Sequence, residues 1–119
     1  MSTRAQVRFA TREDGVSFSE HPEKIHAQFY NHSDGYPEGL GVEIAECFTN
    51  YGKINNWEIE DLTTKHGDLE YIYYIWQKPQ SEAWISIFEV QPFVDRIGEC
   101  IFVGTPQKLL EKYKLNTND

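Results

Sequence analysis

The residues with the richest chemistry lie in one stretch, His32 to Gly41, which reads His-Ser-Asp-Gly-Tyr-Pro-Glu-Gly-Leu-Gly. This stretch joins an expected strand to an expected helix. Asp34-Gly35 favours a tight turn, and Pro37 has the fixed φ that suits the first turn of a helix. Loops on a rigid scaffold often hold binding groups, so this junction is the first candidate site.

Two glycines in the first turns of the expected helix need an explanation, because glycine lowers helix stability. Gly39 and Gly41 could allow the helix to pack closely against the sheet. They could also leave room for a ligand or partner over the free N–H groups of the helix start. Both explanations stay open, although Glu38 beside those N–H groups makes an anionic ligand less favourable there.

Imidazole and carboxylate groups at the junction could serve a metal or a proton transfer. His26 and His32 are on the polar face of the preceding expected strand, but about 20 Å of strand separates them, so they cannot share one ion. The chain has no nucleophile elbow motif, no phosphate-binding loop motif and no Cys beside a His. Ser33 next to His32 is therefore only weak evidence for a catalytic nucleophile. Acid or base catalysis by Asp34 or His32 stays open. The sequence thus predicts no metal and no cofactor, and it favours binding over catalysis.

An aromatic run from Tyr71 to Trp76 is the second candidate site. Alternation along a strand places Tyr71, Tyr73 and Ile75 on one face and Ile72, Tyr74 and Trp76 on the other. Three arrangements stay open: a core closed on both faces, a surface for a second copy or a partner, and an aromatic platform for a ligand. If one face is exposed, the run predicts self-association.

Arg4 and Arg8 alternate with apolar residues in the first expected strand. Their guanidinium groups could bind an anion or balance the acidic helix, and solvation at the surface is the alternative.

The hydrophobic patterns predict one α+β domain over residues 1–119, with an antiparallel sheet of about six strands and two helices in the order ββαββββα. The first helix is expected at about 37 to 51, with Asp34 as a cap and Gly52 as the stop. The second is expected to start with Thr105 as N-cap and Pro106 after it, and to face Leu109, Leu110 and Tyr113 toward the sheet. The strands are expected around Ala5–Phe9, Ile25–His32, Trp57–Leu62, Leu69–Gln77, Ala83–Val90 and Cys100–Val103, with a hairpin at Lys78–Glu82.

Charge and composition narrow the function classes. Nineteen acidic against eleven basic residues give the 119-residue chain a net charge of −8, which argues against general nucleic-acid binding and suits a basic partner. No stretch is long and apolar enough for a membrane span or a secretion signal, so a cytoplasmic protein is expected. Cys47 and Cys100 are expected to be small buried apolar residues, with a disulfide or a reactive thiol as the alternative.

Three blocks of the chain resemble a family of small, mostly uncharacterised phage-associated proteins. These blocks are the initial Met-Ser-Thr-Arg, the His-x-Asp-Gly-Tyr-Pro-x-Gly-x-Gly junction at His32 to Gly41, and the acidic residue before Tyr-x-Tyr in Gly67–Tyr73. The long insert before His26 departs from the shorter first hairpin of that family. The resemblance transfers no catalytic residue or ligand. It implies a phage or mobile-element origin, and small phage accessory proteins often act stoichiometrically on host machinery, including immune systems.

The leading hypothesis is therefore a non-enzymatic phage-type protein that binds and inhibits a host factor, such as a defence or nucleic-acid-handling effector, in the host cytoplasm. The first alternative is a sponge for a nucleotide-like small molecule, with Tyr74, Trp76 or Tyr36 stacked on a base and Arg4 or Arg8 on phosphate. The second alternative is a small hydrolase. A homodimer is considered for the aromatic face. The residues expected to bind a ligand or partner are His32, Asp34, Tyr36, Glu38, Gly39, Tyr30, Tyr74, Trp76, Arg4 and Arg8.

Overall fold

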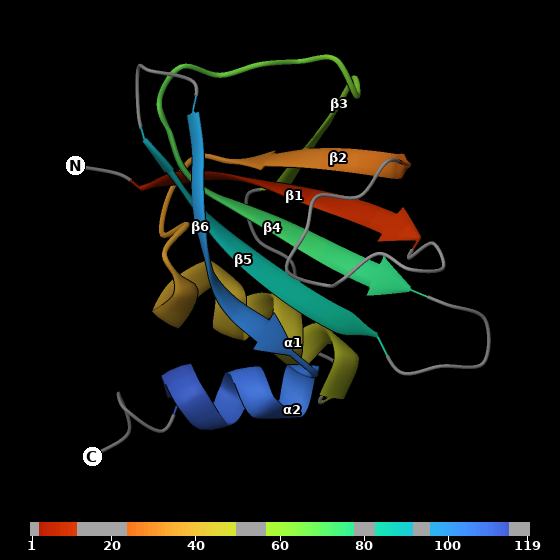
Figure 1. Cartoon of the computed structure of the whole chain (residues 1–119), viewed down its shortest axis with the longest axis vertical. Helices are drawn as coiled ribbons and strands as arrows, with labels where there is room; N and C mark the ends of the chain where they lie inside the picture. The colour runs from red at the N-terminus through yellow and green to blue at the C-terminus, as the bar shows by residue number, and fades with distance from the viewer. Residues whose placement is uncertain (1–2, 12–23, 50–56, 78–82, 92–95, 115–119) are drawn as a thin grey trace.

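The structure is a computed structural model, and it describes residues 3–11, 24–49, 57–77, 83–91 and 96–114. A six-stranded sheet forms one layer and the helices form the other (Figure 1). The elements in chain order are β1 (Arg4–Thr11), β2 (Ile25–Asn31), the π-helical turn η1 (Pro37–Gly41), α1 (Val42–Thr49), β3 (Trp57–Glu60), β4 (Leu69–Gln77), β5 (Trp84–Gln91), β6 (Arg96–Gly104), α2 (Pro106–Leu109) and the π-helical turn η2 (Leu110–Lys114).

The α+β class and the six strands are confirmed, but the expectation of a wholly antiparallel sheet is wrong. The strand order is β3-β2-β1-β4-β5-β6, and the central pair β1–β4 is parallel, whereas the other four pairs are antiparallel. Because β3 and β4 run in the same direction, residues 61–68 must travel back along the sheet between them. We call residues 61–68 the crossover segment. Each expected helix also divides into an α-helical and a π-helical part, so the element order differs in detail from the expected one.

The helices cover one face of the sheet, as the apolar pattern predicts. Val7 and Ile85 of the sheet are 0% exposed in one core cluster with Ile44 of α1 and Leu109 of α2. Thr105 is the N-cap of α2, and its hydroxyl accepts a hydrogen bond from the Lys108 amide at 3.3 Å. In the described part of the chain, none of the helices combines the length and apolar character needed to cross a bilayer.

The start of the first helix differs from the expectation in its cap. The helix begins at Pro37 as expected, but the preceding residue is Tyr36 and no side chain caps the helix start. Asp34 contributes its backbone carbonyl, which accepts a hydrogen bond from the Leu40 amide at 2.9 Å. The described helix ends at Thr49, and Gly52, the expected stop, lies outside the described residues, as does the hairpin turn Lys78–Glu82.

The aromatic strand β4 is closed on both faces within the chain. Tyr73 and Ile75 belong to the helix-side core, while Tyr74 (2% exposed) and Trp76 (1% exposed) belong to a second cluster on the opposite face. The Trp76 indole donates to the Ser86 hydroxyl at 2.7 Å. Of the three arrangements that the sequence left open, the structure has the closed core, so the exposed aromatic face that predicted self-association is absent.

Both edges of the sheet are poor templates for pairing with another strand. β3 has four residues, and Glu58 and Glu60 lie on it. β6 is longer, but its pairing with β5 shifts register twice, once between Ile87 and Phe88 and once between Phe88 and Val90. Short strands, charged side chains and bulges are the usual means by which proteins protect sheet edges from aggregation.

Close packing explains one of the two glycines at the helix start. A Cβ atom on Gly39 would lie 2.6 Å from the Asp34 carbonyl oxygen, whereas a Cβ on Gly41 would lie 3.5 Å from the Tyr73 ring, an ordinary contact distance. Asp34 itself adopts a φ of 57°, in the small left-handed region. Its backbone therefore has little freedom to move the carbonyl oxygen away from an added Cβ atom.

We therefore expect Gly39→Ala to lower the free energy of unfolding by about 1–3 kcal/mol, the usual cost of forcing extra atoms into a packed site. The matched change Gly41→Ala should leave stability unchanged or raise it by up to about 1 kcal/mol, because alanine favours the helix and has room there. Urea denaturation followed by circular dichroism compares the two variants. A Gly39→Ala protein as stable as the wild type would contradict the packing argument.

Candidate functional site

The junction is a tightly bonded corner of the fold. The Gly35 amide donates to the Thr3 carbonyl at 3.0 Å, which ties the turn to the start of the chain beside β1. The buried Tyr73 hydroxyl donates to the Gly35 carbonyl at 2.6 Å, which ties the turn to the core. These backbone groups of the junction are therefore used within the fold.

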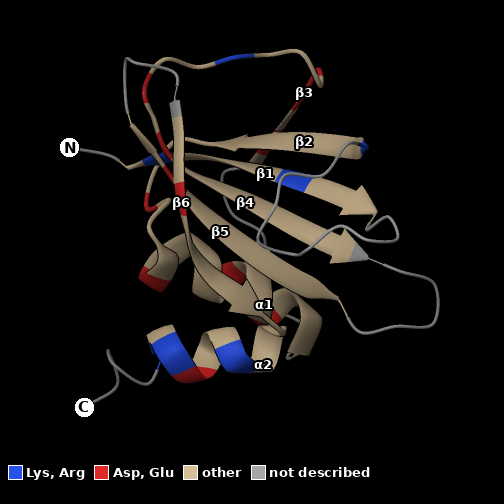
Figure 2. Cartoon of the chain, viewed as in Figure 1, with Lys and Arg blue, Asp and Glu red and all other residues tan. Residues whose placement is uncertain are grey.

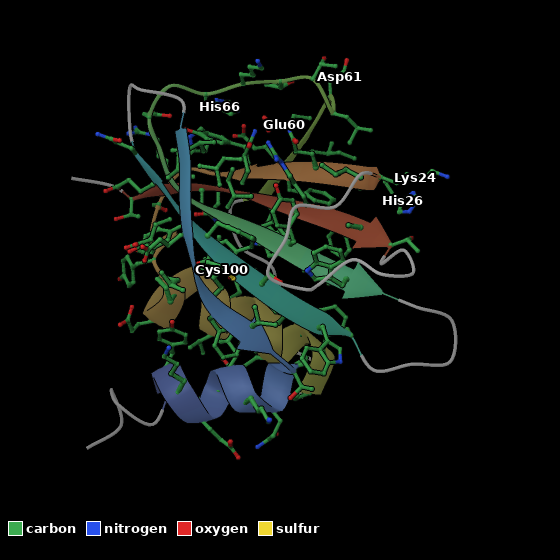
Figure 3. All side chains as sticks on the ribbon, in the orientation of Figure 1. Lys24, His26, Glu60, Asp61, His66 and Cys100 are labelled. Atoms are coloured by element: carbon green, nitrogen blue, oxygen red, sulfur yellow. The ribbon has the colours of Figure 1, made fainter. Side chains whose placement is uncertain are left out.

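Four side chains of the junction are exposed: His32, Asp34, Tyr36 and Glu38. The His32 Nε2 atom lies 2.7 Å from Glu58 Oε1 on β3, and the Tyr36 hydroxyl lies 3.4 Å from Asp34 Oδ1. Glu38 is exposed in the first turn of the helix. His26, at the far end of β2, contacts the Thr11 hydroxyl at 2.6 Å, and Figure 3 shows it well away from His66. Among the described residues, no cluster of His, Cys, Asp and Glu is arranged to hold a metal ion.

The face of the sheet opposite the helices carries a polar network centred on Arg8. Its guanidinium donates from Nε to Gln28 Oε1 at 3.0 Å, from Nη1 to the Tyr74 hydroxyl at 3.0 Å and from Nη2 to Gln6 Oε1 at 2.9 Å. The guanidinium carbon also lies 5.7 Å from the centre of the Tyr74 ring. The sequence expectation placed Arg8 and Tyr74 in one candidate set, and the structure brings them into contact.

The crossover segment and the end of β3 close this network. Glu60 Oε1 accepts from the amide nitrogens of Gln6 at 2.7 Å and Gln28 at 2.9 Å, and the Thr64 carbonyl accepts from the same two nitrogens at 3.2 and 3.1 Å. Glu60 Oε2 lies 2.7 Å from His66 Nε2 (Figure 3). Both glutamine side chains are 0% exposed, so their amides are held in fixed positions.

The other candidate side chains on this face either contact neighbouring residues or are buried. The Arg4 guanidinium forms an ion pair with Asp68 at 3.1 Å. Tyr30 is 6% exposed and stacks on the His66 ring, with 3.8 Å between the ring centres. Tyr74 and Trp76 are buried, so the structure does not assemble the expected platform of an aromatic ring stacked on a base beside a phosphate-binding arginine.

A pocket of about 250 Å³ opens beside Arg8 on this face, and we call it the basic pocket. It is lined by Gln6, Arg8, Lys65, His66, Leu69, Ile72, Val90 and Ile97. Three of these side chains can carry a positive charge and none is acidic, although the protein as a whole is strongly acidic. In Figure 2 the blue segments on β1 and on the crossover segment mark this side.

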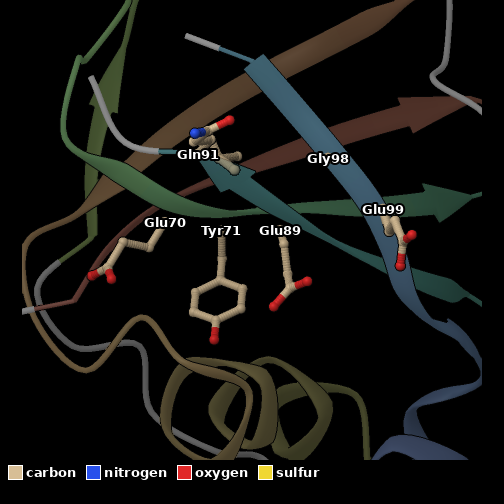
Figure 4. A pocket seen from close by; sticks show the side chains of 7 residues that line it. Glu70, Tyr71, Glu89, Gln91, Gly98 and Glu99 are labelled. Atoms are coloured by element: carbon tan, nitrogen blue, oxygen red, sulfur yellow. The ribbon is translucent and has the colours of Figure 1, made fainter. Parts of the chain in front are cut away.

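A second pocket, of about 350 Å³, has the opposite charge, and we call it the acidic cleft. It is lined by Glu70, Tyr71, Glu89, Val90, Gln91, Gly98 and Glu99. Figure 4 shows Glu70, Tyr71 and Glu89 pointing from the sheet toward the helical layer. Three carboxylates and one aromatic ring therefore line the same cleft at the end of the sheet where β4 begins.

The junction contributes to the electrostatics of this cleft. Burial, and then the carboxylates of Glu89, Glu38 and Glu70, raise the pKa of Tyr71 above its usual value. Glu38 is the only one of these three that the sequence had placed among the candidates. The structure thus brings the junction and the aromatic strand together through Glu38 and Tyr71.

The surroundings of both cysteines disfavour the reactive thiolate form. Cys47 and Cys100 are not joined in a disulfide, each is partly buried, and burial is the main cause that raises the pKa of both. A raised pKa lowers the thiolate fraction and with it the reactivity.

The sequence reasoning missed most of the residues that line the two pockets. The candidate residues did not include Gln6 or Gln28. Gln6 is two residues from Arg8 on the same strand and Gln28 lies opposite Arg8 on the next strand, and such a grouping is a signal for a buried network. Lys65 and His66 come from the crossover segment, and the glutamates of the cleft come from three strands. No local pattern groups such residues.

Comparison with models of protein families, with curated proteins and with solved structures finds no match to the chain.

The buried Tyr73 hydroxyl predicts a pH dependence of stability. Burial, and then the neighbouring Tyr71 and Tyr113, raise the pKa of Tyr73 well above its usual value. An unfolded tyrosine loses its proton near pH 10, so above that pH the unfolded state binds fewer protons and the free energy of unfolding falls. Tyr73→Phe should lower stability at pH 8 by about 1–3 kcal/mol, because the Gly35 carbonyl loses its partner, and should make the decline above pH 10 shallower.

Urea denaturation between pH 8 and pH 11 measures both effects, with the exposed Tyr36→Phe as control. Equal slopes above pH 10 for the wild type and the Tyr73 variant would show that Tyr73 is not responsible for the alkaline decline.

Proposed function

We propose that the chain is a non-enzymatic accessory protein of the phage type that binds a basic segment of a host protein in the acidic cleft and thereby inhibits that protein. The observation that carries the proposal is that Glu70, Glu89 and Glu99 line one hollow of about 350 Å³ together with Tyr71. The phage origin comes from the resemblance in the junction and the N-terminal block, and the host cytoplasm is the compartment in which such a protein would act.

The chemistry of the cleft suits an arginine or lysine side chain. A guanidinium can form paired hydrogen bonds with a carboxylate, and the face of a tyrosine ring attracts a cation. Glu38 on the neighbouring helix start adds negative charge to the same end of the molecule, as its effect on the pKa of Tyr71 and Tyr113 indicates. A basic segment would thus meet carboxylates from the sheet on one side and from the helical layer on the other.

The charge of the whole chain favours the same kind of partner. A net charge of −8 attracts a basic surface over distances of about 10 Å and speeds association. Proteins that handle nucleic acids present basic grooves to phosphate backbones, and an acidic protein seated in such a groove excludes the nucleic acid. Nucleic-acid-handling effectors, including defence proteins, are therefore the proposed class of target.

A second candidate function, capture of a small molecule, is favoured by a different observation, the basic pocket beside Arg8. Its chemistry is developed in the next subsection. No arrangement of the described residues favours the hydrolase alternative.

The cleft is tested with a fluorescent oligo-arginine peptide, with oligo-citrulline as the neutral peptide of similar shape. We expect the wild type to bind the arginine peptide, and the triple variant Glu70→Gln, Glu89→Gln, Glu99→Gln to bind it at least about tenfold more weakly, a loss of about 1.4 kcal/mol. The measurement is fluorescence anisotropy at near-physiological salt, where long-range effects of net charge are partly screened.

A matched variant separates the cleft from net charge. Glu58→Gln, Asp61→Asn, Glu111→Gln also removes three negative charges, from exposed positions outside the cleft. Its affinity for the arginine peptide should stay close to that of the wild type. Equal weakening by both triple variants would mean that the peptide responds to net charge alone, and the proposed site would be wrong.

A further inference from the structure

Arg8 is held in place by neutral acceptors, Gln28, Tyr74 and Gln6. A guanidinium has five N–H donors, and three of those of Arg8 are used by Gln28, Tyr74 and Gln6, which leaves two. Among the described residues, no carboxylate lies within ion-pair distance of Arg8, whereas Arg4 has Asp68 at 3.1 Å. Within the described part of the chain, the positive charge of Arg8 therefore retains two donors and has no direct counter-ion.

The nearest carboxylate in the network is already engaged. Glu60 reaches Arg8 only through the side-chain amides of Gln6 and Gln28, and its second oxygen contacts His66. The glutamines are fully buried and their nitrogens are fixed by Glu60 and the Thr64 carbonyl. Their oxygens in turn fix the guanidinium, so the donors of Arg8 are oriented before a ligand arrives, which reduces the entropy lost on binding.

The rest of the pocket combines further positive charge with an apolar wall. Lys65 and His66 line it from the crossover segment, and Leu69 and Ile72, which are 5% and 2% exposed, line it from β4. Ile97 on β6 is 38% exposed and completes the apolar side. Sites for small ligands commonly have mostly apolar walls and a few fixed polar groups.

The volume limits the ligand. At about 250 Å³ the pocket is smaller than the roughly 300–1,000 Å³ of most ligand sites. A single ring or a short acyl chain with one anionic head group matches this space better than a whole nucleotide, whose base would also need a stacking ring. The rings of Tyr74 and Trp76 are buried and do not offer one.

We propose that the basic pocket binds a small organic anion, with a carboxylate or phosphate head group on Arg8 and Lys65 and an apolar body against Leu69, Ile72 and Ile97. This inference goes beyond the proposed function, because the basic pocket shares only Val90 with the lining of the acidic cleft and has the opposite charge. The ligand is recognised by the same groups whether its head is a carboxylate or a phosphate.

The probes are benzoate, hexanoate and phenyl phosphate, with benzamide as the neutral analogue of benzoate and inorganic phosphate as the anion without an apolar body. We expect saturable shifts of the backbone amide signals of β1, β4 and the crossover segment in NMR titrations with the three organic anions. Which head group binds more tightly distinguishes a carboxylate ligand from a phosphate ligand. Benzamide and inorganic phosphate should bind much more weakly than their organic anion counterparts.

Charge reversal at Lys65 tests the site without changing Arg8. This matters because substitution of Arg8 also removes the hydrogen bonds that hold Gln6, Gln28 and Tyr74. Lys65→Glu, at an exposed position, should weaken benzoate binding by about fivefold or more, whereas Lys108→Glu on α2 should leave it unchanged. Arg8→Lys should abolish saturable binding if the variant remains folded by circular dichroism. The proposal is overturned if benzamide binds as tightly as benzoate, if inorganic phosphate matches phenyl phosphate, if the two lysine variants behave alike, or if no probe gives saturable shifts.

Discussion

A partly buried guanidinium lies in the middle of the sheet, beside a pocket, and the polar network on that face is arranged around its hydrogen bonds. Arg8 is on β1, next to the parallel partner β4 and the antiparallel partner β2. Removing such a charge from water is costly unless its donors are satisfied. Gln6, Gln28 and Tyr74 supply the acceptors, and they come from the three central strands.

This requirement connects the network to the topology. The amide nitrogens of Gln6 and Gln28 need acceptors of their own, and these are Glu60 at the end of β3 and the Thr64 carbonyl in the crossover segment. The same segment is the one that must return along the sheet because β1 and β4 are parallel. One stretch of chain therefore both satisfies the buried amides and stacks His66 on Tyr30 at the second face. The opposite face has an apolar core that is covered by the helices, and the acidic cleft lies beside this layer.

Local patterns in the sequence predicted the bounds, the buried face and the cap of individual strands and helices. Period-two alternation placed Val7 toward the helices and Arg8 away from them, β4 has the predicted bounds Leu69–Gln77, and Thr105 caps α2 as predicted. Strand order was not predictable, because neither strand of the parallel pair β1–β4 carries a local mark of its partner. The closure of the aromatic face was left open for the same reason, since residues far along the chain cover it. Gly39 was predicted to need a packing or a binding reason, and only coordinates could show the Asp34 carbonyl in its way.

The central claim is that Arg8 is a fixed, partly unused donor group, and its side-chain Nε–H signal tests it most directly. In a ¹⁵N-resolved NMR spectrum this signal should be visible and protected from exchange with water, because the Nε–H donates to Gln28 at 3.0 Å. It should shift on addition of benzoate and stay in place on addition of the oligo-arginine peptide. An Arg8 Nε–H signal that exchanges rapidly with water and does not shift when benzoate is added would contradict the account.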